Sequence, residues 1–152
     1  MEQMQLSDLI GPGDIVVGVR AADIGTAAAL LLRETLPRRG LAPVDVERLV
    51  AAVLEREKEA PTLCGVIAIP HARDPLLESF VAAIGINPGG VFQGSAALRV
   101  IIVFVSPEAK RSEHLALLSS IARFGRDDAA VSSMAAMTSV EDVAQFIHRL
   151  KL

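Results

Sequence analysis

The stretch CGVIAIPHARDP, residues 64–75, decides the expected fold because it joins an apolar run directly to a polar one. Residues 66–69 are all aliphatic, which predicts a short strand covered on both faces. Proline at position 70 cannot donate to a central ladder, so we expect the strand to end there, with His71 following the strand and preceding a loop. Ligands gather at strand ends in open α/β proteins, which makes His71 a candidate nucleophile or base. The simpler interpretation is a histidine that caps a strand end through ordinary hydrogen bonds.

Three other apolar runs predict further strands, at residues 15–19, 79–87 and 98–107. We expect the sequence PGG, residues 88–90, to break the second of these. Too few residues separate the strand before His71 from the one at 79–87 for a helical crossover. A purely parallel sheet is therefore not expected.

Five segments have the spacing of amphipathic helices: residues 23–38, 42–60, 112–127, 127–137 and 139–152. Asp23, Ser112 and Ser139 are the expected N-caps of three of them. In the helix at 112–127, the apolar positions Leu115, Leu118, Ile121 and Ala122 are expected to face the core. Strands in the middle of the chain with helices at both ends predict one α/β domain over residues 1–152, a small mixed sheet sandwiched by helices.

Composition restricts the classes of function. Of the 152 residues, 51% are apolar but only 3% are aromatic, so stacking platforms for single-stranded nucleic acid are not expected. The net charge of −3 gives a nucleic-acid role no electrostatic support. A single cysteine excludes an internal disulfide and fits a reducing environment. The first residues lack the pattern of a signal peptide and no apolar run is long enough to cross a bilayer, so we expect a cytoplasmic protein.

The chain has three histidines that could carry chemistry. His114 lies near a predicted helix start, where a neutral ring is favoured or a bound anion could offset the cost of a charged one; the alternative is an ordinary surface histidine. We interpret His148 as a solvated or half-buried helix residue, and Cys64 as inert core. The sequence lacks HExxH, GxGxxG and Walker patterns, and GSAA at 94–97 is not a GxSxG elbow. No metal or cofactor is therefore expected.

Four segments in this order resemble a known family: EREKEAPT at 55–62, GVIAIPHAR at 65–73, LRVIIVFVSPE at 98–108 and EHLALLSSIARFGRDD at 113–128. The combination resembles enzyme IIA domains of the phosphoenolpyruvate:sugar phosphotransferase system, of the mannitol/fructose type that includes the nitrogen-regulatory branch. The resemblance extends from Leu6 to the last helix and implies the enzyme IIA mannitol/fructose-type fold.

The resemblance also implies a histidine phosphocarrier with a sugar-specific or nitrogen-regulatory role. His71 would accept a phosphoryl group from the carrier protein HPr or a paralogue, His114 would support it with a hydrogen bond, and Arg56 would face the phosphoryl oxygens. Arg73 would belong to the docking surface. Downstream partners would be an enzyme IIB domain, a transporter or a kinase, and no metal would be needed.

The stretch before His71 departs from the family pattern. The family has two glycines ahead of its IAIPH motif, whereas TLCGVIAIPH, residues 62–71, is one residue shorter and keeps only Gly65. Such a loop could supply backbone donors to a phosphate. Its shortening favours an alternative function, a non-phosphorylated regulatory or binding module that acts on a partner such as a transporter.

Overall fold

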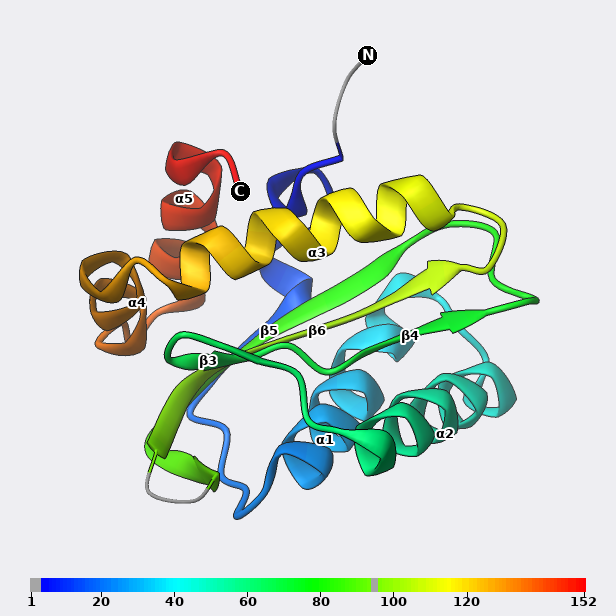
Figure 1. Cartoon of the computed structure of the whole chain (residues 1–152), viewed down its shortest axis with the longest axis horizontal. Helices are drawn as coiled ribbons and strands as arrows, with labels where there is room; N and C mark the ends of the chain where they lie inside the picture. The colour runs from blue at the N-terminus through cyan, green and yellow to red at the C-terminus, as the bar shows by residue number, and fades with distance from the viewer. Residues whose placement is uncertain (1–3, 94–95) are drawn as a thin grey trace.

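A six-stranded mixed sheet lies between two layers of helices in this computed structural model, which describes residues 4–93 and 96–152 (Figure 1). The strand order is β1-β5-β6-β3-β2, and β4 pairs with β6 beyond the end of β3. The predicted fold class, a small mixed sheet sandwiched by helices, is confirmed. The sequence GSAA at 94–97 was not expected to form a nucleophile elbow, and its first two residues, Gly94 and Ser95, lie outside the described residues.

The long antiparallel pair β5 and β6 forms the centre of the sheet. Parallel pairings join β1 to β5, and β3 and β4 to β6, whereas β2 and β3 form a short antiparallel hairpin. The strands are β1 Ile15–Val17, β2 Leu63–Cys64, β3 Ile67–Ala68, β4 His71–Asp74, β5 Val81–Gln93 and β6 Ala96–Pro107.

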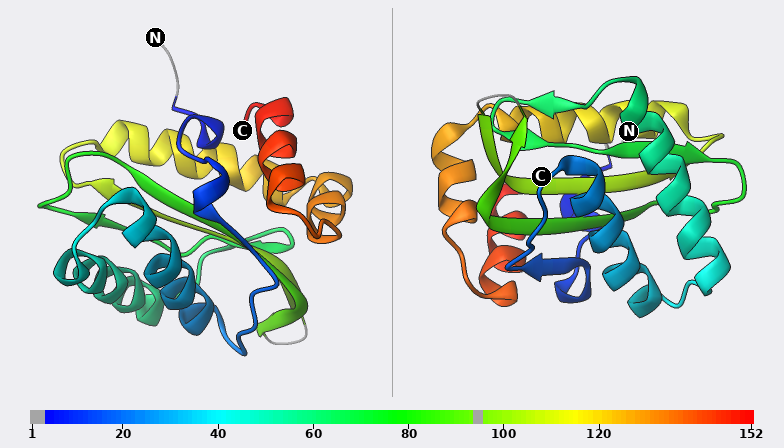
Figure 2. Two further views of the ribbon diagram at one scale, coloured as in Figure 1. Left: turned by 180° about the vertical axis from the view of Figure 1, so that it is seen from behind. Right: turned by 90° about the horizontal axis from the view of Figure 1, so that it is seen from below.

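Alternating residues of β6 serve two separate apolar cores. Ile102 and Phe104 belong to the core beneath α3, α4 and α5, and Ile101 and Val103 belong to the core beneath α1 and α2. Figure 2 shows the same two layers from behind and from below. The helices are α1 Ile24–Thr35, α2 Pro43–Glu59, α3 Arg111–Gly125, α4 Asp128–Ala135 and α5 Val140–Leu150, with short 3₁₀ helices at Leu6–Asp8, Pro12–Asp14 and Leu36–Arg39.

Pairing with β6 resumes after a short interruption at Pro70, so the prediction that a loop directly follows His71 is wrong. His71 is the first residue of β4, and it pairs with Phe104 of β6 in a parallel register. Proline interrupts the ladder because it has no N–H, but its carbonyl still accepts a hydrogen bond of 3.2 Å from the Phe104 amide. The chain therefore keeps following β6, and His71 is held by a strand.

The sequence PGG at 88–90 is a bulge within β5, and the prediction that it breaks the strand is wrong. Pairing shifts from Ile86 opposite Val100 to Val91 opposite Leu98, so four residues of β5 oppose Arg99 alone. Extra residues of this kind bend a strand and leave it part of the sheet. The faces of β6 change at this point, since Leu98 and Val100 belong to different cores.

Helix α3 begins earlier than expected, and its buried face matches the predicted one at Ile121 and partly at Leu118 and Ala122, but not at Leu115. Its N-cap is Lys110 and Ser112 lies within the first turn, so the predicted cap at Ser112 is wrong. Leu115 is 51% exposed, whereas the buried side of α3 carries His114, Leu117, Ile121 and Phe124. The caps at Asp23 and Ser139 are confirmed by bonds of 2.7 Å and 3.1 Å to the amides of Thr26 and Asp142.

The hairpin between β2 and β3 packs its turn against the C-terminal end of α3. Gly65 has a φ of +59°, and a Cβ added there would lie 2.0 Å from the carbonyl oxygen of Gly125. The Val66 amide donates to that same oxygen at 3.3 Å. The turn therefore requires glycine for its backbone conformation and for the close approach of α3.

We predict that Gly65→Ala lowers the free energy of unfolding by about 3 kcal/mol, through backbone strain and displacement of the turn from α3. The matched control is Gly40→Ala, which has a φ of +89° but nothing within 4 Å of the added Cβ. It should lose only about 1 kcal/mol. Urea denaturation measures both, and equal losses would contradict the close contact at Gly65.

Candidate active site

A pocket of about 580 Å³ at the edge of the sheet brings His71, His114 and Arg56 together. Its walls come from α2, from β4 and from the start of α3. The residues that line it are Ala52, Glu55, Arg56, Glu59, His71, Ala72, Arg73, Glu108, Arg111, His114, Leu115 and Leu118. The three residues that the sequence analysis selected therefore share one cavity.

The ring of His71 is buried but keeps one nitrogen at the pocket. The residue is 6% exposed, and Nδ1 lies 2.8 Å from the backbone carbonyl oxygen of Ile69. A carbonyl only accepts, so Nδ1 carries the proton and Nε2 has the lone pair. Nε2 has no partner among the described residues, where no fully buried side-chain nitrogen or oxygen lacks one. Nε2 therefore reaches the solvent of the pocket.

His71, His114 and Phe104 form a triangle of rings. The His71 ring stacks on Phe104 with centroids 5.4 Å apart and an interplanar angle of 13°. His114 lies 5.3 Å from His71 and 5.1 Å from Phe104. Phe104 is fully buried, so it holds both imidazoles against a rigid part of the sheet.

Ser106 is a site residue that the sequence analysis missed. It follows Phe104 by two positions and so lies on the same face of β6. Its Oγ is 2.7 Å from Nδ1 of His114, and the residue is completely buried. The alternation of side chains along β6 places Ser106 on the same face as Phe104. To predict its contact, one would also need to know that the buried face of α3 turns His114 toward the sheet.

Burial and neighbouring cations keep both imidazoles neutral. Desolvation lowers the pKa of His71, the bond to Ile69 opposes this, and Arg56 adds to the lowering. Desolvation, followed by the charges of His71, Arg73 and Arg56, lowers the pKa of His114 to about 4. At pH 7 the pocket therefore presents two uncharged rings beside fixed positive charges.

Arginine side chains from three elements line the pocket. Arg56 lies near the end of α2 and donates to the carbonyl of Ala60 at 3.1 Å, Arg73 extends from β4, and Arg111 is the first residue of α3. Arg111 was not among the site residues predicted from the sequence. Glu55, Glu59 and Glu108 also line the cavity. Guanidinium groups bind anions with oxygen atoms at fixed angles, so this arrangement suits a phosphoryl group.

An ion pair between Arg48 and Asp74 links the two elements that carry Arg56 and His71. The guanidinium of Arg48 on α2 donates to the carboxylate of Asp74 at the end of β4, with Nε 3.1 Å from Oδ1 and Nη2 3.2 Å from Oδ2. Asp74 is 3% exposed. Loss of Arg48 would leave the Asp74 carboxylate charged in a poorly solvated place, so the pair opposes sliding of α2 along β4.

The glycine-containing turn before His71 does not line the pocket. Residues 62–66 are absent from its walls, and the Val66 amide is directed at α3. The turn therefore lies outside the cavity that holds His71. The arginine and histidine side chains that line the cavity together with His71 are Arg56, Arg73, Arg111 and His114.

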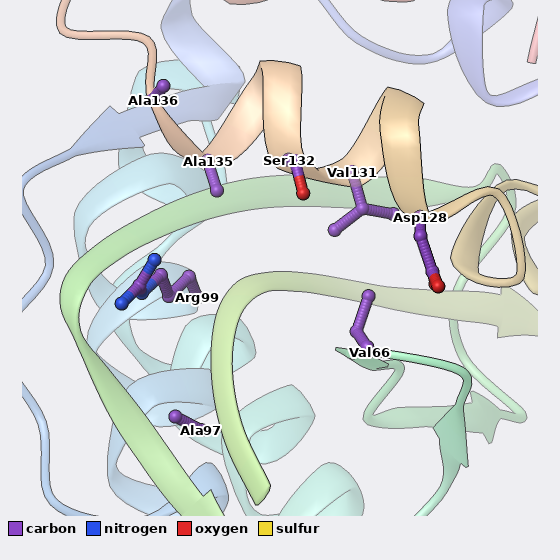
Figure 3. A pocket seen from close by; sticks show the side chains of 8 residues that line it. All are labelled: Val66, Ala97, Arg99, Asp128, Val131, Ser132, Ala135 and Ala136. Atoms are coloured by element: carbon purple, nitrogen blue, oxygen red, sulfur yellow. The ribbon is translucent and has the colours of Figure 1, made fainter.

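A second pocket, of about 440 Å³, lies between α4 and β6 and is lined by one cation, Arg99, and one carboxylate, Asp128 (Figure 3). The other side chains in Figure 3 are aliphatic, apart from the hydroxyl of Ser132. Among its described lining residues, this pocket therefore lacks a histidine or cysteine that could act as a nucleophile or general base.

The remaining cysteine and histidine line neither of these two pockets. Cys64 is half-buried, with Sγ 3.4 Å from the carbonyl of Ala122, and His148 is exposed on α5.

Within residues 4–93 and 96–152, no three His, Cys, Asp or Glu side chains are placed to hold a metal ion. The helices of the same ranges are all too short or too polar to span a membrane.

The chain is similar to proteins of known families. Residues 34–150 match the family described as "Phosphoenolpyruvate-dependent sugar phosphotransferase system, EIIA 2". The chain is also similar to the mannitol-specific EIICBA component of the PTS system of Escherichia coli (strain K12), with 30% identity over 103 residues. That match covers 64% of this chain but only 16% of the much longer relative.

Solved structures of other proteins share the fold, among them the following two. The nitrogen regulatory protein IIA-Ntr from Neisseria meningitidis superimposes with a TM-score of 0.80 and 20% identity, over 93% of this chain and 98% of that one. Enzyme IIA of the mannitol system from Escherichia coli, solved in complex with phosphorylated enzyme IIB, has a TM-score of 0.76 and 22% identity, over 92% and 97% of the two chains.

The depressed pKa of His114 makes stability depend on pH. The unfolded ring titrates near 6.5 and the folded one at about 4, so the folded protein is favoured above pH 6.5 and loses this advantage as the pH falls to 4. Between pH 6.5 and pH 4 the free energy of unfolding therefore falls. We predict that His114→Gln reduces this fall by roughly 2 kcal/mol, a figure lowered to allow for solvent at the ring edge. Urea denaturation at pH 7 and pH 4 measures it. An unchanged pH dependence would show that the ring titrates normally.

Proposed function

Because the chain belongs to the EIIA 2 family of the phosphoenolpyruvate-dependent sugar phosphotransferase system, we propose that it is a phosphoryl carrier that works through His71. The donor is the phosphohistidine of HPr or a paralogous carrier protein. The observation that carries the proposal is the state of the His71 ring, whose Nδ1 is held by the Ile69 carbonyl while Nε2 reaches the pocket.

The transfer step needs a neutral nucleophile and a positioned anion. The lone pair on Nε2 of His71 attacks phosphorus, the P–N bond to the donor histidine breaks, and its electron pair returns to the donor ring. His71 remains protonated on Nδ1, where the Ile69 carbonyl stabilises the positive charge that develops on the ring. The lowered pKa of His71 keeps Nε2 unprotonated at pH 7. Phosphoryl transfer depends mostly on such positioning and on charge stabilisation, so no metal is required.

The charges around the pocket match the other demands of the reaction. Arg56 and Arg111 supply guanidinium groups for the phosphoryl oxygens, and His114 supplies a neutral ring beside the acceptor. Arg73 follows His71 by two residues on β4 and is exposed, so a docked partner would meet it. These roles follow from shared location in one cavity.

The acceptor downstream is proposed from the relatives. The mannitol enzyme IIA of Escherichia coli forms a complex with phosphorylated enzyme IIB. We propose that this chain also passes its phosphoryl group to an enzyme IIB domain. Leu115, exposed by 51% at the pocket wall, offers an apolar contact for such a partner and for the donor carrier. Contacts of this kind suit a small transient interface.

We predict that the chain takes up acid-labile label from radioactive phosphoenolpyruvate in the presence of enzyme I and the cognate HPr, and that His71→Ala abolishes the uptake. His148→Ala is the matched control, because His148 is exposed on α5 and does not line the pocket. It should be labelled like the wild type. A wild-type chain that takes up no label from its own carrier would contradict the proposal and support the alternative, a regulatory binding module.

Arg56→Ala should slow phosphoryl transfer by about 10- to 100-fold, because a charge-assisted bond to the phosphoryl group is lost. Folding should be unaffected within about 1 kcal/mol, since the side chain is only half-buried and its one hydrogen bond among the described residues is to the carbonyl of exposed Ala60. Rapid-quench kinetics and urea denaturation measure the two effects. Arg123→Ala, on the exposed side of α3, is the control. Unfolding of Arg56→Ala would make Arg56 a structural residue instead.

A further inference from the structure

Ser106 and His114 form a buried pair whose hydrogen-bond direction has a consequence for the pocket. Ser106 Oγ lies 2.7 Å from Nδ1 of His114, and Ser106 is 0% exposed. A hydroxyl can donate to an unprotonated Nδ1 or accept from a protonated one. The first arrangement leaves the ring proton on Nε2 and the second leaves it on Nδ1. The two differ in what His114 can offer to a ligand.

We propose that Ser106 is a positioning residue, which donates its hydroxyl proton to Nδ1 of His114 and so keeps the ring proton on Nε2, facing the pocket. The tautomer of His114 does not depend on the proposed function, whereas its consequence for phosphoryl transfer rests on the function proposed above.

The direction of this hydrogen bond is set by the need of the buried Ser106 hydroxyl for an acceptor for its proton. Among the described residues, Nδ1 of His114 is the one hydrogen-bond partner that Ser106 Oγ has. If Oγ accepted from Nδ1, its own proton would have no acceptor in a site without solvent, and a buried donor left unpaired is costly. If Oγ donates, the proton is bonded and only oxygen lone pairs stay unused. The donating direction is therefore favoured.

The free nitrogen of His114 then becomes a donor. Nε2 bonds to no other described residue, and it is not a buried unpaired atom, so it reaches the pocket that His114 lines. The neutral ring presents Nε2–H there, 5.3 Å between centroids from the His71 ring. A phosphoryl oxygen on His71 would meet a donor, whereas the other tautomer would present a lone pair and repel it.

The two histidines thus receive opposite tautomers from opposite partners. The Ile69 carbonyl can only accept, so His71 keeps its proton on Nδ1 and exposes a lone pair. The Ser106 hydroxyl donates, so His114 keeps its proton on Nε2 and exposes an N–H. One ring becomes a nucleophile and the other a hydrogen-bond donor, although both are neutral imidazoles in the same cavity.

Nitrogen-15 NMR of the unphosphorylated protein, labelled at its histidines, tests the tautomer directly at pH 7. We expect His114 to carry its proton on Nε2, with the Nδ1 resonance shifted by an accepted hydrogen bond. Ser106→Ala should move that resonance toward the position of an unbonded nitrogen, and Ser106→Thr, which keeps the hydroxyl, should restore it. A wild-type proton on Nδ1 of His114 would overturn the proposal, whether or not the protein is ever phosphorylated.

Transfer kinetics test the consequence. Ser106→Ala should slow phosphorylation of His71 by about tenfold, because the donor to the phosphoryl group is no longer fixed. Ser106→Thr should recover most of the rate. Ser120→Ala is the matched control, a buried serine on α3 that does not line the pocket, and should react like the wild type. A Ser106→Ala protein with wild-type rate would overturn the positioning role, and failure of the wild type to react would instead count against the proposed function.

Discussion

One hydrogen bond, from Nδ1 of His71 to the carbonyl of Ile69, determines what the pocket can do. The bond exists because the strand along β6 is interrupted at Pro70. Ile69 donates its own N–H to Thr62, Pro70 has none to donate, and the Ile69 carbonyl is left for the His71 ring. β4 then resumes pairing at once, so the ring is fixed by the sheet. A short irregularity in a strand thus orients the His71 side chain. The ring therefore loses little conformational freedom when a ligand binds.

The surrounding structure keeps the other groups in place around this ring. β6 contributes Phe104 below both histidines and Ser106 behind one of them. On the opposite face of β4, Asp74 binds Arg48 and so ties the strand to α2, which carries Arg56 two turns later. The pocket lies where two layers of helices meet at one edge of the sheet. Its charges come from elements that are packed into different cores, which makes its geometry a property of the whole fold.

The sequence predicted the architecture well because aliphatic runs and helical spacing are strong signals. It also selected His71, His114 and Arg56, and the structure lines one pocket with all three, although their roles stay proposals. The errors share a physical origin. Proline and glycine at 70 and 88–90 were expected to end strands, but pairing with the long β6 overrides these local preferences. On α3, the predicted face is correct for Ile121 and partly correct for Leu118 and Ala122, but Leu115 is exposed. The buried face is turned toward His114, because the core there accepts that residue through its bond to Ser106. That bond depends on tertiary packing and has no signature in the spacing of residues.

The regiochemistry of phosphorylation tests the central claim most directly. After the chain is charged through its own carrier protein, phosphorus–nitrogen coupling in nitrogen-15 NMR identifies which nitrogen of which ring carries phosphorus. The bond to Ile69 predicts phosphorus on Nε2 of His71, with the proton still on Nδ1. Phosphorus on Nδ1 of His71, or on His114, would contradict the account.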